Sequence, residues 1–568
     1  MIKEGIRVKR EKKFDRIDIA IYVLIFLSIL LFWIPFMGRD YPAGAEIPFH
    51  YARIGTLADS LKEGIFPAKL RPMHMKLYGY GVGFFYPDIF IYPAAILIVL
   101  GVRPALAIKI FEFVYIVAGA LIGYTCYRRL TGNRLAALFG EVLFIGSRIN
   151  FDNFVGGSGL PHLNAYLFAP LAIVGLLEAL EDKKRGYIDY AIGITLVILS
   201  HHLIFMTLMF SLFLIVIAHI DVVVKNVRIL GKLFAVSLVA MAFTTAYWLP
   251  AMEQAIHIKF IAVYDNSYNL ADHIMGFYRL FTNDVGIILY VLFIISAAAY
   301  AVFCIKKKKA DRPVVTIFII DVLMMYITCS RTIWLGPVGQ ALSFFQYTER
   351  FVYVLTNLMI IFIVMVIGKL TLPVIEKKRE YVIASLFISA FFILLTRFDN
   401  KADFYDLSSY PQRVLNPQDY MEEYEVSGAE WLPVECEPSA CTEPNYSRAS
   451  DGAGADGFKH ENAKYYEVWA DLSKEYYDVP YVYYYGYRAY LVDDDLKPTE
   501  ELKVGEAYDD NGYVRVFMPE GRSDFGHLLV TYKKTTVQKT AYVISAVTAV
   551  LLVAALALEI CRKRKGTR

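Results

Sequence analysis

Long apolar runs separated by short polar loops dominate this chain of 568 residues. The first run, from Ile17 to Met37, is long enough to cross a hydrocarbon core of roughly 30 Å. Eleven later runs cover residues 105–127, 135–148, 162–180, 187–201, 202–220, 232–250, 284–305, 313–330, 351–369, 380–396 and 541–560. The pattern predicts a mainly α-helical, polytopic membrane protein with about twelve transmembrane helices.

Residues 88–101 form a further apolar stretch that contains Pro93 and is too short to cross comfortably. If this stretch does not cross, the basic loops between the spans all fall on the cytoplasmic side, together with the basic head at residues 1–16. We therefore expect residues 88–101 to form a helix along the outer surface, and both termini to be cytoplasmic. The string Ala43-Gly44-Ala45 mimics a signal-peptidase site, but the length of the first run favours an uncleaved anchor.

Residues 397–538 contain twice as many acidic as basic residues and should form the large extracytoplasmic domain. Their second half predicts strands in YYEVWADL, VPYVYYYGYRAYLV, GYVRVFMP and HLLVTYK, which fit a small β-sandwich. The tyrosines between Tyr476 and Tyr490 favour plain strand packing over stacking on sugar rings. Cys436 and Cys441 close a small loop, and whether they form a disulfide is left open.

The expected domains follow from these boundaries. They are a cytoplasmic head at residues 1–16, a transmembrane domain at 17–396 with its first outer loop at 38–104, the outer β-rich domain at 397–538, and a last span with a basic tail at 539–568. A hydrophobic content of 57% with 20% charged residues excludes a soluble globule of this size. No nucleic-acid partner is expected, and the cysteines show no metal-binding spacing.

The polar stretch at residues 40–87 is the best place for chemistry. Glu46 and His50 lie four positions apart at the entry to a helical pattern, so both side chains should point the same way. A carboxylate at a membrane surface is a candidate general base. The alternative is an ordinary loop in which Glu46 caps the helix.

Other candidate groups lie at or near the ends of apolar runs. The pair His201-His202 could bind a metal or a phosphate, or could form an interfacial turn. Lys109 and Glu112 lie three positions apart, so they could face a cavity or neutralise each other. A divalent metal is left open.

Several motifs resemble a known family in their order along the chain. They are GAEIPFHYARIGTLADSLKEGIFPAKL at 44–70, GYGVGFFYPDIFIYPAAIL at 79–97, AYWLPAMEQ at 246–254, FFQYTERFVYVL at 344–355 and the tail from VPYVYYYGYRAYLVDDD to the last span. Together they resemble the GT-C superfamily of membrane glycosyltransferases, and within it the YfhO-type bacterial membrane proteins. The resemblance implies a GT-C-like helical domain.

The resemblance also implies a reaction. Such enzymes take a sugar from a polyprenyl-phosphate carrier, such as undecaprenyl phosphate, and give it to an extracytoplasmic acceptor such as a teichoic-acid-like polymer, with inversion. The implied base is Glu46, and His50 either orients it or contacts the sugar. The implied phosphate ligands are Arg350 as first choice, then Lys109, His201 and His202, with an interfacial anchor as the alternative role of Arg350. The remaining candidates are Arg53, Tyr78, Tyr80, Tyr86, His162 and Glu253.

The implied partners are the lipid-linked donor, the acceptor polymer or glycolipid, the bilayer, a separate glycosyltransferase that makes the donor, and a flippase. Two other classes stay open. A transporter or flippase of lipid-linked sugars would also be polytopic and bind phosphate, but would need no base in an outer loop. A non-catalytic scaffold of envelope assembly would depend on the β-rich domain and not on Glu46.

Overall fold

The computed structural model describes residues 16–157, 159–264, 274–342, 345, 347–371, 378–399, 412–415, 430–441, 445–459 and 464–566. The basic head, part of the basic loop at 375–380 and most of residues 400–429 lie outside the described residues. The chain divides into two compact units, each described here by itself. We call them the bundle unit, residues 1–45, 109–240 and 269–414, and the loop–sheet unit, residues 46–108, 241–268 and 415–568.

The bundle unit is helical, apart from the short antiparallel pair β1 (Tyr41–Pro42) and β2 (Gln412–Arg413). Its longer helices are α1 (Arg16–Phe32), α5 (Pro104–Thr131), α6 (Arg134–Gly146), α8 (Leu160–Leu180), α9 (Lys184–Ile198), α10 (His202–Ala218), α12 (Val227–Phe243), α16 (Ile287–Lys307), α17 (Arg312–Cys329), α20 (Val352–Thr371) and α21 (Lys378–Asp399). Short turns of helix join them: α7 (Arg148–Phe151), α11 (Ile220–Lys225), α15 (Phe277–Arg279), α18 (Arg331–Trp334), α19 (Pro337–Ala341) and η6 (Thr348–Phe351).

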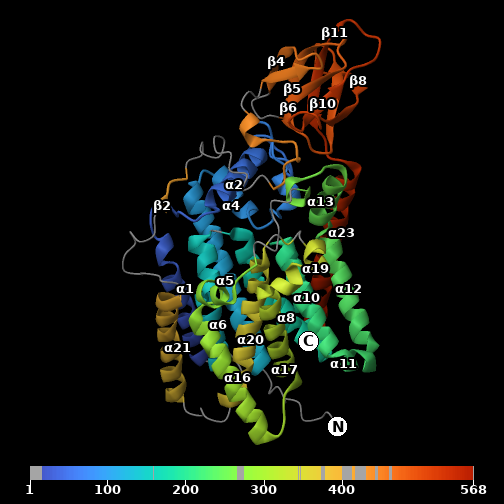
Figure 1. Cartoon of the computed structure of the whole chain (residues 1–568). Helices are drawn as coiled ribbons and strands as arrows, with labels where there is room; N and C mark the ends of the chain where they lie inside the picture. Colours follow the sequence, from blue (N-terminus) through green and yellow to red (C-terminus); the bar gives the residue numbers. More distant parts are fainter. Residues whose placement is uncertain are drawn as a thin grey trace. The chain divides into compact units, whose positions relative to one another are not determined.

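The helix α20 lies at the centre of this unit and packs against α6, α8, α16 and α17 (Figure 1). The spans that contain α8 and α20 are each 94% buried inside the protein, although both are strongly apolar. A helix that is apolar all round belongs in such an interior, because no side of it needs to meet water.

Six described helical segments are long and apolar enough to cross a membrane, or seven if the broken pair of α12 and α13 (Thr245–His257) is counted as one span. They are Pro104–Thr131, Leu160–Leu180, Ile287–Lys307, Arg312–Cys329, Thr348–Leu370 and Thr536–Arg562. Other predicted spans coincide with shorter helices, such as α1 with 17 residues and α9 with 15. The number twelve therefore stays a prediction.

The loop–sheet unit contains the first polar loop and the C-terminal strands. Its helices are α2 (Ile47–Lys62), α3 (Val82–Phe85), α4 (Tyr92–Val99), α13 (Thr245–His257), α14 (Ile261–Tyr264) and α23 (Thr536–Gly566). The helix α4 has eight residues and packs on α2. At 1.5 Å per residue it rises only about 12 Å, so residues 88–101 are too short to span, as predicted.

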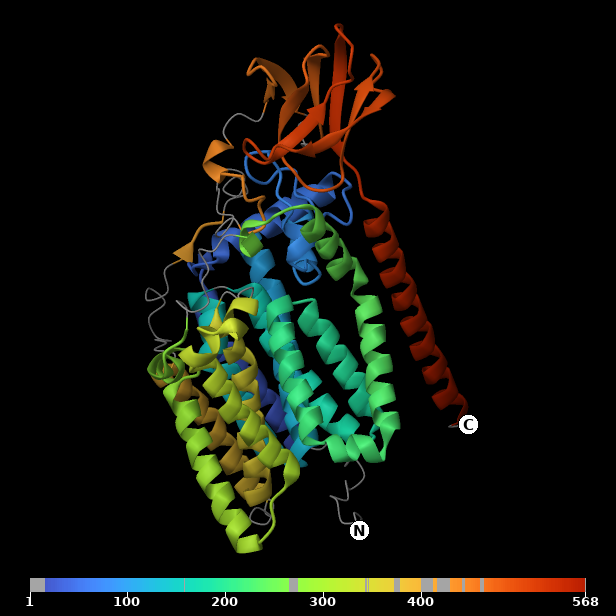
Figure 2. The same ribbon diagram turned by 45° about the vertical axis from the view of Figure 1, so that its right-hand side comes forward.

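The strands form a nine-stranded antiparallel sheet (Figure 2). They are β3 (Tyr446–Ala449), β4 (Gly454–Lys459), β5 (Tyr465–Asp471), β6 (Tyr476–Val482), β7 (Tyr487–Val492), β8 (Pro498–Leu502), β9 (Val504–Glu506), β10 (Tyr513–Phe517) and β11 (Phe525–Tyr532), in the spatial order β8-β7-β11-β5-β4-β3-β6-β10-β9.

This sheet is nearly closed into a barrel, which corrects the predicted sandwich. The edge strands β8 and β9 follow each other in the chain with Lys503 alone between them, so the two edges must lie close together. The first half of β4 pairs with β3 and its second half with β5, which carries the ladder round a corner. A near-barrel protects strand edges that an open sandwich would expose.

The first loop shares a hydrophobic core with the sheet. Tyr78, Tyr80 and Phe84 are buried in the same cluster as Tyr481 and Tyr484, and Val482 donates a backbone hydrogen bond to Tyr78 (2.9 Å). The packing interpretation holds for Tyr477, Tyr481, Tyr484 and Tyr487, which are buried, whereas the other tyrosines between Tyr476 and Tyr490 are partly exposed. Loop and sheet are therefore one folded body.

A glycine makes this close packing feasible. A Cβ placed on Gly81 would lie 2.3 Å from the ring of Tyr484, so a side chain at this position has no room. Nearby, Cys436 and Cys441 are buried free thiols in this structure.

Candidate active site

The helix α2 presents three functional side chains on one face. Glu46, His50 and Arg53 follow the spacing i, i+4 and i+7, which places them on the same side of a helix. Pro48 near the first helical position pre-organises the start of α2. His50 and Arg53 are each only 1% exposed, whereas the carboxylate side chain of Glu46 is 41% exposed. One end of this face thus carries the accessible carboxylate of Glu46, and the other carries the buried side chains of His50 and Arg53.

Glu46 occupies the N-cap position of α2, but its side chain makes no capping hydrogen bond. Its Oε2 instead lies 3.2 Å from Nε2 of His50. The prediction that the two side chains point the same way is confirmed, and the capping alternative is wrong. The positive end of the helix dipole also favours the charged form of a carboxylate at this place.

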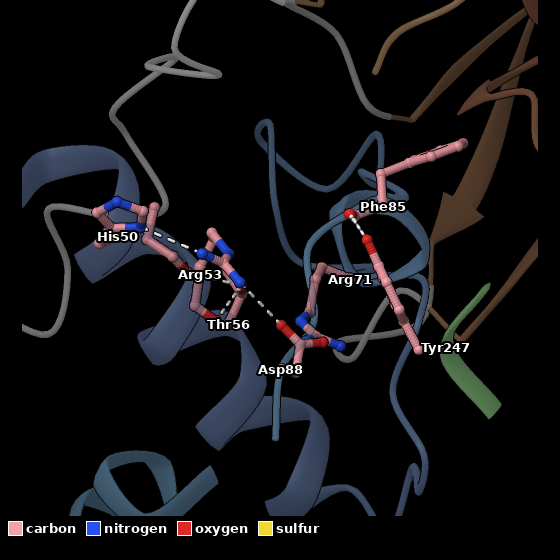
Figure 3. Close-up of polar contacts among 8 residues, drawn as sticks. His50, Arg53, Thr56, Arg71, Phe85, Asp88 and Tyr247 are labelled. Carbon is pink, nitrogen blue, oxygen red and sulfur yellow. Dashed lines mark hydrogen bonds and ion pairs between the residues drawn. The ribbon is translucent and has the colours of Figure 1, made fainter. Parts of the chain in front are cut away.

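Behind His50 lies an ion-pair network. Arg53 contributes Nη1, which is 3.2 Å from Nδ1 of His50, and Nη2, which donates to Asp88 Oδ1 at 3.2 Å. The second oxygen of Asp88 accepts from Nη2 of Arg71. Figure 3 shows Asp88 lying between the two arginines. Asp88 and Arg71 are 6% and 0% exposed, so this carboxylate serves two buried cations at once.

A second glycine, Gly83, allows the side chain of Asp88 to lie close to the neighbouring backbone. A Cβ on Gly83 would lie 2.8 Å from Asp88 Oδ2 and 2.6 Å from the backbone oxygen of Lys69. Nearby, Tyr247 of α13 donates to the backbone oxygen of Phe85 at 2.8 Å (Figure 3). The loop around Asp88 is therefore held on several sides.

Burial sets the charge states in this network. It lowers the pKa of His50 below the usual range; the hydrogen bond to Glu46 opposes this shift, and the charge of Arg53 adds to it. Burial also lowers the pKa of Lys69 to about 8, with Asp88 opposing the shift and Arg71 adding to it. For His74, burial and the charges of Arg71 and Arg53 lower the pKa to about 3. His50 and His74 are therefore neutral at physiological pH.

The three candidate tyrosines of the first loop have structural contacts. Tyr86 donates to Glu430 Oε2 (2.9 Å), and its ring lies under the guanidinium of Arg53 at 4.6 Å. Tyr80 accepts a hydrogen bond from the backbone of Trp431. Tyr78 packs in the core with the sheet. Of these, Tyr86 alone touches the network of α2.

A second candidate cluster lies in the bundle unit. The ring of His162 lies 4.3 Å from that of His201 and 5.3 Å from that of Tyr353, and the rings of His201 and His202 are stacked at 5.5 Å. His201 caps α10, and its Nδ1 accepts from two backbone N–H groups of that helix, so its Nε2 carries the proton.

Arg350 lies beside these histidines. It belongs to η6, which contacts the start of α10, and it is 9% exposed. Its guanidinium donates to the backbone oxygen of Phe345 and lies over the ring of Tyr347 at 5.5 Å. The charge of Arg350 acts on His201 and His202, and the ring of His162 lies against that of His201, a combination suited to an anion.

Two other predicted site residues hold backbone or helices together. Lys109 donates to the backbone oxygens of Gly38 (2.8 Å) and Asp40. Glu253 of α13 accepts from Thr535 (2.8 Å) and Gln538 (3.3 Å) at the start of α23. Within the described part of the chain, no group of three or more His, Cys, Asp or Glu side chains is arranged to hold a metal.

Asp88 and Arg71 are the functional candidates that the sequence did not indicate. Asp88 lies in a Tyr-Pro-Asp turn, and its partners are 35 and 17 positions away, so no helical or strand period links them. The one local signal is that a charged residue follows an aromatic, glycine-rich segment that is otherwise apolar.

Comparison with known proteins gives a family match. The family described as "6-pyruvoyl-tetrahydropterin synthase related domain; membrane protein" matches residues 84–401, which is more than half of the chain. No curated protein matches the chain.

Three solved structures show partial similarity to this chain, each with a TM-score below 0.5. The arabinofuranosyltransferase AftD from Mycobacteria is 12% identical and has a TM-score of 0.45, over 70% of this chain and 27% of that one. The oligosaccharyltransferase AglB from Archaeoglobus fulgidus, in complex with an inhibitory peptide and a dolichol-phosphate, is 13% identical with a TM-score of 0.41, over 73% and 60%. The arabinosyltransferase EmbB from Mycobacterium smegmatis is 9% identical with a TM-score of 0.34, over 93% and 64%. This chain spans less than two thirds of each of them.

Proposed function

The chain belongs to the 6-pyruvoyl-tetrahydropterin synthase related family of membrane proteins, and we propose for it a reaction at the membrane surface: transfer of a sugar from a polyprenyl-phosphate carrier to an extracytoplasmic acceptor. The observation that carries the proposal is the pairing of an accessible carboxylate, Glu46, with a buried chain of bases and ions that orients it. The YfhO-like order of motifs supports the same reaction class.

The chemistry needs few groups. An acceptor hydroxyl attacks the anomeric carbon of the donor, the bond between that carbon and the phosphate oxygen breaks, and polyprenyl phosphate leaves with the electron pair. Glu46 takes the proton of the attacking hydroxyl, so a single displacement inverts the anomeric centre. His50 holds the carboxylate through its Nε2–H.

The phosphate needs cations and hydrogen-bond donors. We assign this role to Arg350 of the bundle unit together with His201 and His202, whose rings are stacked, and with His162, whose ring lies 4.3 Å from that of His201. The assignment rests on the resemblance in the order of motifs. A guanidinium offers two parallel donors to a phosphate, and Nε2 of His201 supplies a neutral donor. Lys109 is a weaker candidate, because its ammonium group already donates to two backbone oxygens.

The proposed sidedness follows the distribution of basic loops. Both termini and the basic loops face the cytoplasm, and the first polar loop and the β-rich domain face outward. The acceptor is then a polymer or glycolipid of the cell envelope, and the donor is made by a separate enzyme and delivered by a flippase.

The test is single-turnover transfer by the purified full chain in lipid nanodiscs, with synthetic farnesyl-phosphate-linked pentoses and hexoses as donors and alkyl glycosides as acceptors. Wild-type protein should release farnesyl phosphate and form the new glycoside, and Glu46→Gln should be slower by about 10² to 10⁴. The matched control is Glu63→Gln, at the other end of α2, where Glu63 pairs with Lys464.

The control protein should keep wild-type transfer. Full activity of Glu46→Gln would remove Glu46 as the base. Movement of the lipid-linked sugar across liposomes without release of farnesyl phosphate would favour the transporter alternative.

A further inference from the structure

The contact between Arg53 and His50 determines which ring nitrogen of His50 carries the proton. A guanidinium has five N–H donors and no acceptor, so Nη1 of Arg53, at 3.2 Å, can only donate to Nδ1 of His50. Nδ1 must then offer its lone pair, and the single proton of the neutral ring lies on Nε2. That nitrogen lies 3.2 Å from Oε2 of Glu46 and donates to it.

The position of Arg53 depends in turn on Asp88. The guanidinium is buried, its Nη2 donates to Asp88 Oδ1, and its flat face lies over the ring of Tyr86 at 4.6 Å. Arg71 donates to the other carboxylate oxygen, which prevents Asp88 from rotating toward either arginine alone. Asp88 thereby sets where the guanidinium of Arg53 lies.

We propose that Asp88 is a positioning residue that acts through Arg53 to hold His50 in the Nε2–H form and so aims the carboxylate of Glu46. Asp88 touches neither Glu46 nor His50 in this arrangement; its effect passes along the series Asp88, Arg53, His50 and Glu46. Outer partners that orient metal ligands typically change activity by about 10- to 100-fold when removed, and we expect an effect of the same size for Asp88. The inference rests on the proposed function for its effect on rate, but not for its effect on the histidine.

The first test determines directly which nitrogen of the His50 ring is protonated. The full chain is labelled with ¹⁵N-histidine and studied in lipid by magic-angle spinning NMR, and His50→Gln identifies the signals of His50. Wild-type protein should show a protonated Nε2 and an unprotonated Nδ1. Asp88→Asn should add a second population with the proton on Nδ1, because the amide no longer holds Arg53 by charge. An unchanged single Nε2–H form in Asp88→Asn would overturn the proposal, whatever reaction the protein catalyses.

A second variant keeps the test decisive if Asp88→Asn does not fold. Arg53→Met removes the donor to Nδ1 while Asp88 keeps its bond to Arg71. It should produce the same change in the His50 signals. A wild-type His50 signal in Arg53→Met would equally overturn the proposal.

Rate measurements distinguish a positioning role of Asp88 from a purely structural role. Asp88→Asn should lower kcat by about 10- to 100-fold with the KM for the farnesyl-phosphate donor unchanged, and should have little further effect in a Glu46→Gln background. The matched control is Asp478→Asn, which breaks another buried pair in the same unit, that of Asp478 with Arg515 (2.7 Å), and should lower stability without lowering kcat. Additive losses from Asp88→Asn and Glu46→Gln would assign Asp88 a merely structural role.

Discussion

The carboxylate of Glu253 accepts a hydrogen bond from Thr535 at 2.8 Å across 282 positions of sequence. This bond joins α13 to the start of α23, and Gln538 adds a second donor. We expect Glu253→Gln to lower the free energy of unfolding by about 1.5–3 kcal/mol, the range for hydrogen bonds to charged groups. Thermal unfolding in detergent measures this. Thr535→Val should cause a similar loss that does not add to the first, and sugar transfer per folded molecule should not change.

Glu46→Asp should transfer sugar at a rate between those of wild-type protein and Glu46→Gln. The charge remains, but the carboxylate retracts by one methylene from the acceptor and from Nε2 of His50. Single-turnover rates with one synthetic donor give the order. A rate of Glu46→Asp below that of Glu46→Gln would show that charge at this position does not help, and would contradict a base.

Arg350→Ala should weaken donor binding by about 10- to 100-fold, because a charge-assisted hydrogen bond contributes about 1.5–3 kcal/mol. Arg350→Lys should recover part of that loss, since an ammonium replaces a planar fork. Binding of a farnesyl-phosphate sugar to the purified protein measures the effect. Thermal stability is recorded in parallel, because Arg350 also donates to the backbone of Phe345. Equal donor binding by all three proteins would exclude Arg350 from the site.

His74 should make the protein sensitive to acid. Burial holds its pKa at about 3 in the folded state, against about 6.5 for an exposed histidine. Between these values the unfolded chain binds the extra proton, so stability falls as the pH falls from about 6.5 toward 3, by at most about 1.4 kcal/mol per pH unit from this group. His74→Gln should flatten the pH dependence of the unfolding free energy. Parallel curves for the two proteins would contradict this prediction.

The sidedness proposal predicts a labelling pattern. Glu181 lies exposed in the turn between α8 and α9, and Glu500 lies exposed on β8. In a protein without its six native cysteines, a membrane-impermeant thiol reagent applied to intact cells should label Glu500→Cys and spare Glu181→Cys until the cells are opened. Labelling of Glu181→Cys from outside would reverse the scheme.

Local patterns predicted those parts of the fold that local forces determine. The four predicted strand segments contain β5, β7 and β10 and overlap most of β6 and β11, whose first residues lie outside them. Aromatic and β-branched residues, which favour strands, dominate these segments. The strands β3, β4, β8 and β9 were not predicted. These strands are short or polar. They form by pairing with strands that are distant in the sequence, and the local alternation of side chains does not indicate such pairing.

The candidate site divides in the same way. Glu46 and His50 were found because one helical turn separates them. Arg53 was a candidate without a stated role, and its partner Asp88 was missed, because a tertiary contact across a turn brings them together. The ring contact between His162 and His201 joins the starts of two helices, so the sequence indicated the residues but not that they meet.

The shared core of the first loop and the sheet has a consequence for biosynthesis. The ribosome makes Tyr78 and Tyr80 early, but Tyr481 and Tyr484, which pack in the same core, emerge about 400 residues later. At 5–20 residues per second that interval lasts about 20–80 s. During this time the loop that carries Glu46 lacks most of the core that it shares with the sheet. The nascent chain can therefore complete this core only after the strands that carry Tyr481 and Tyr484 have been made.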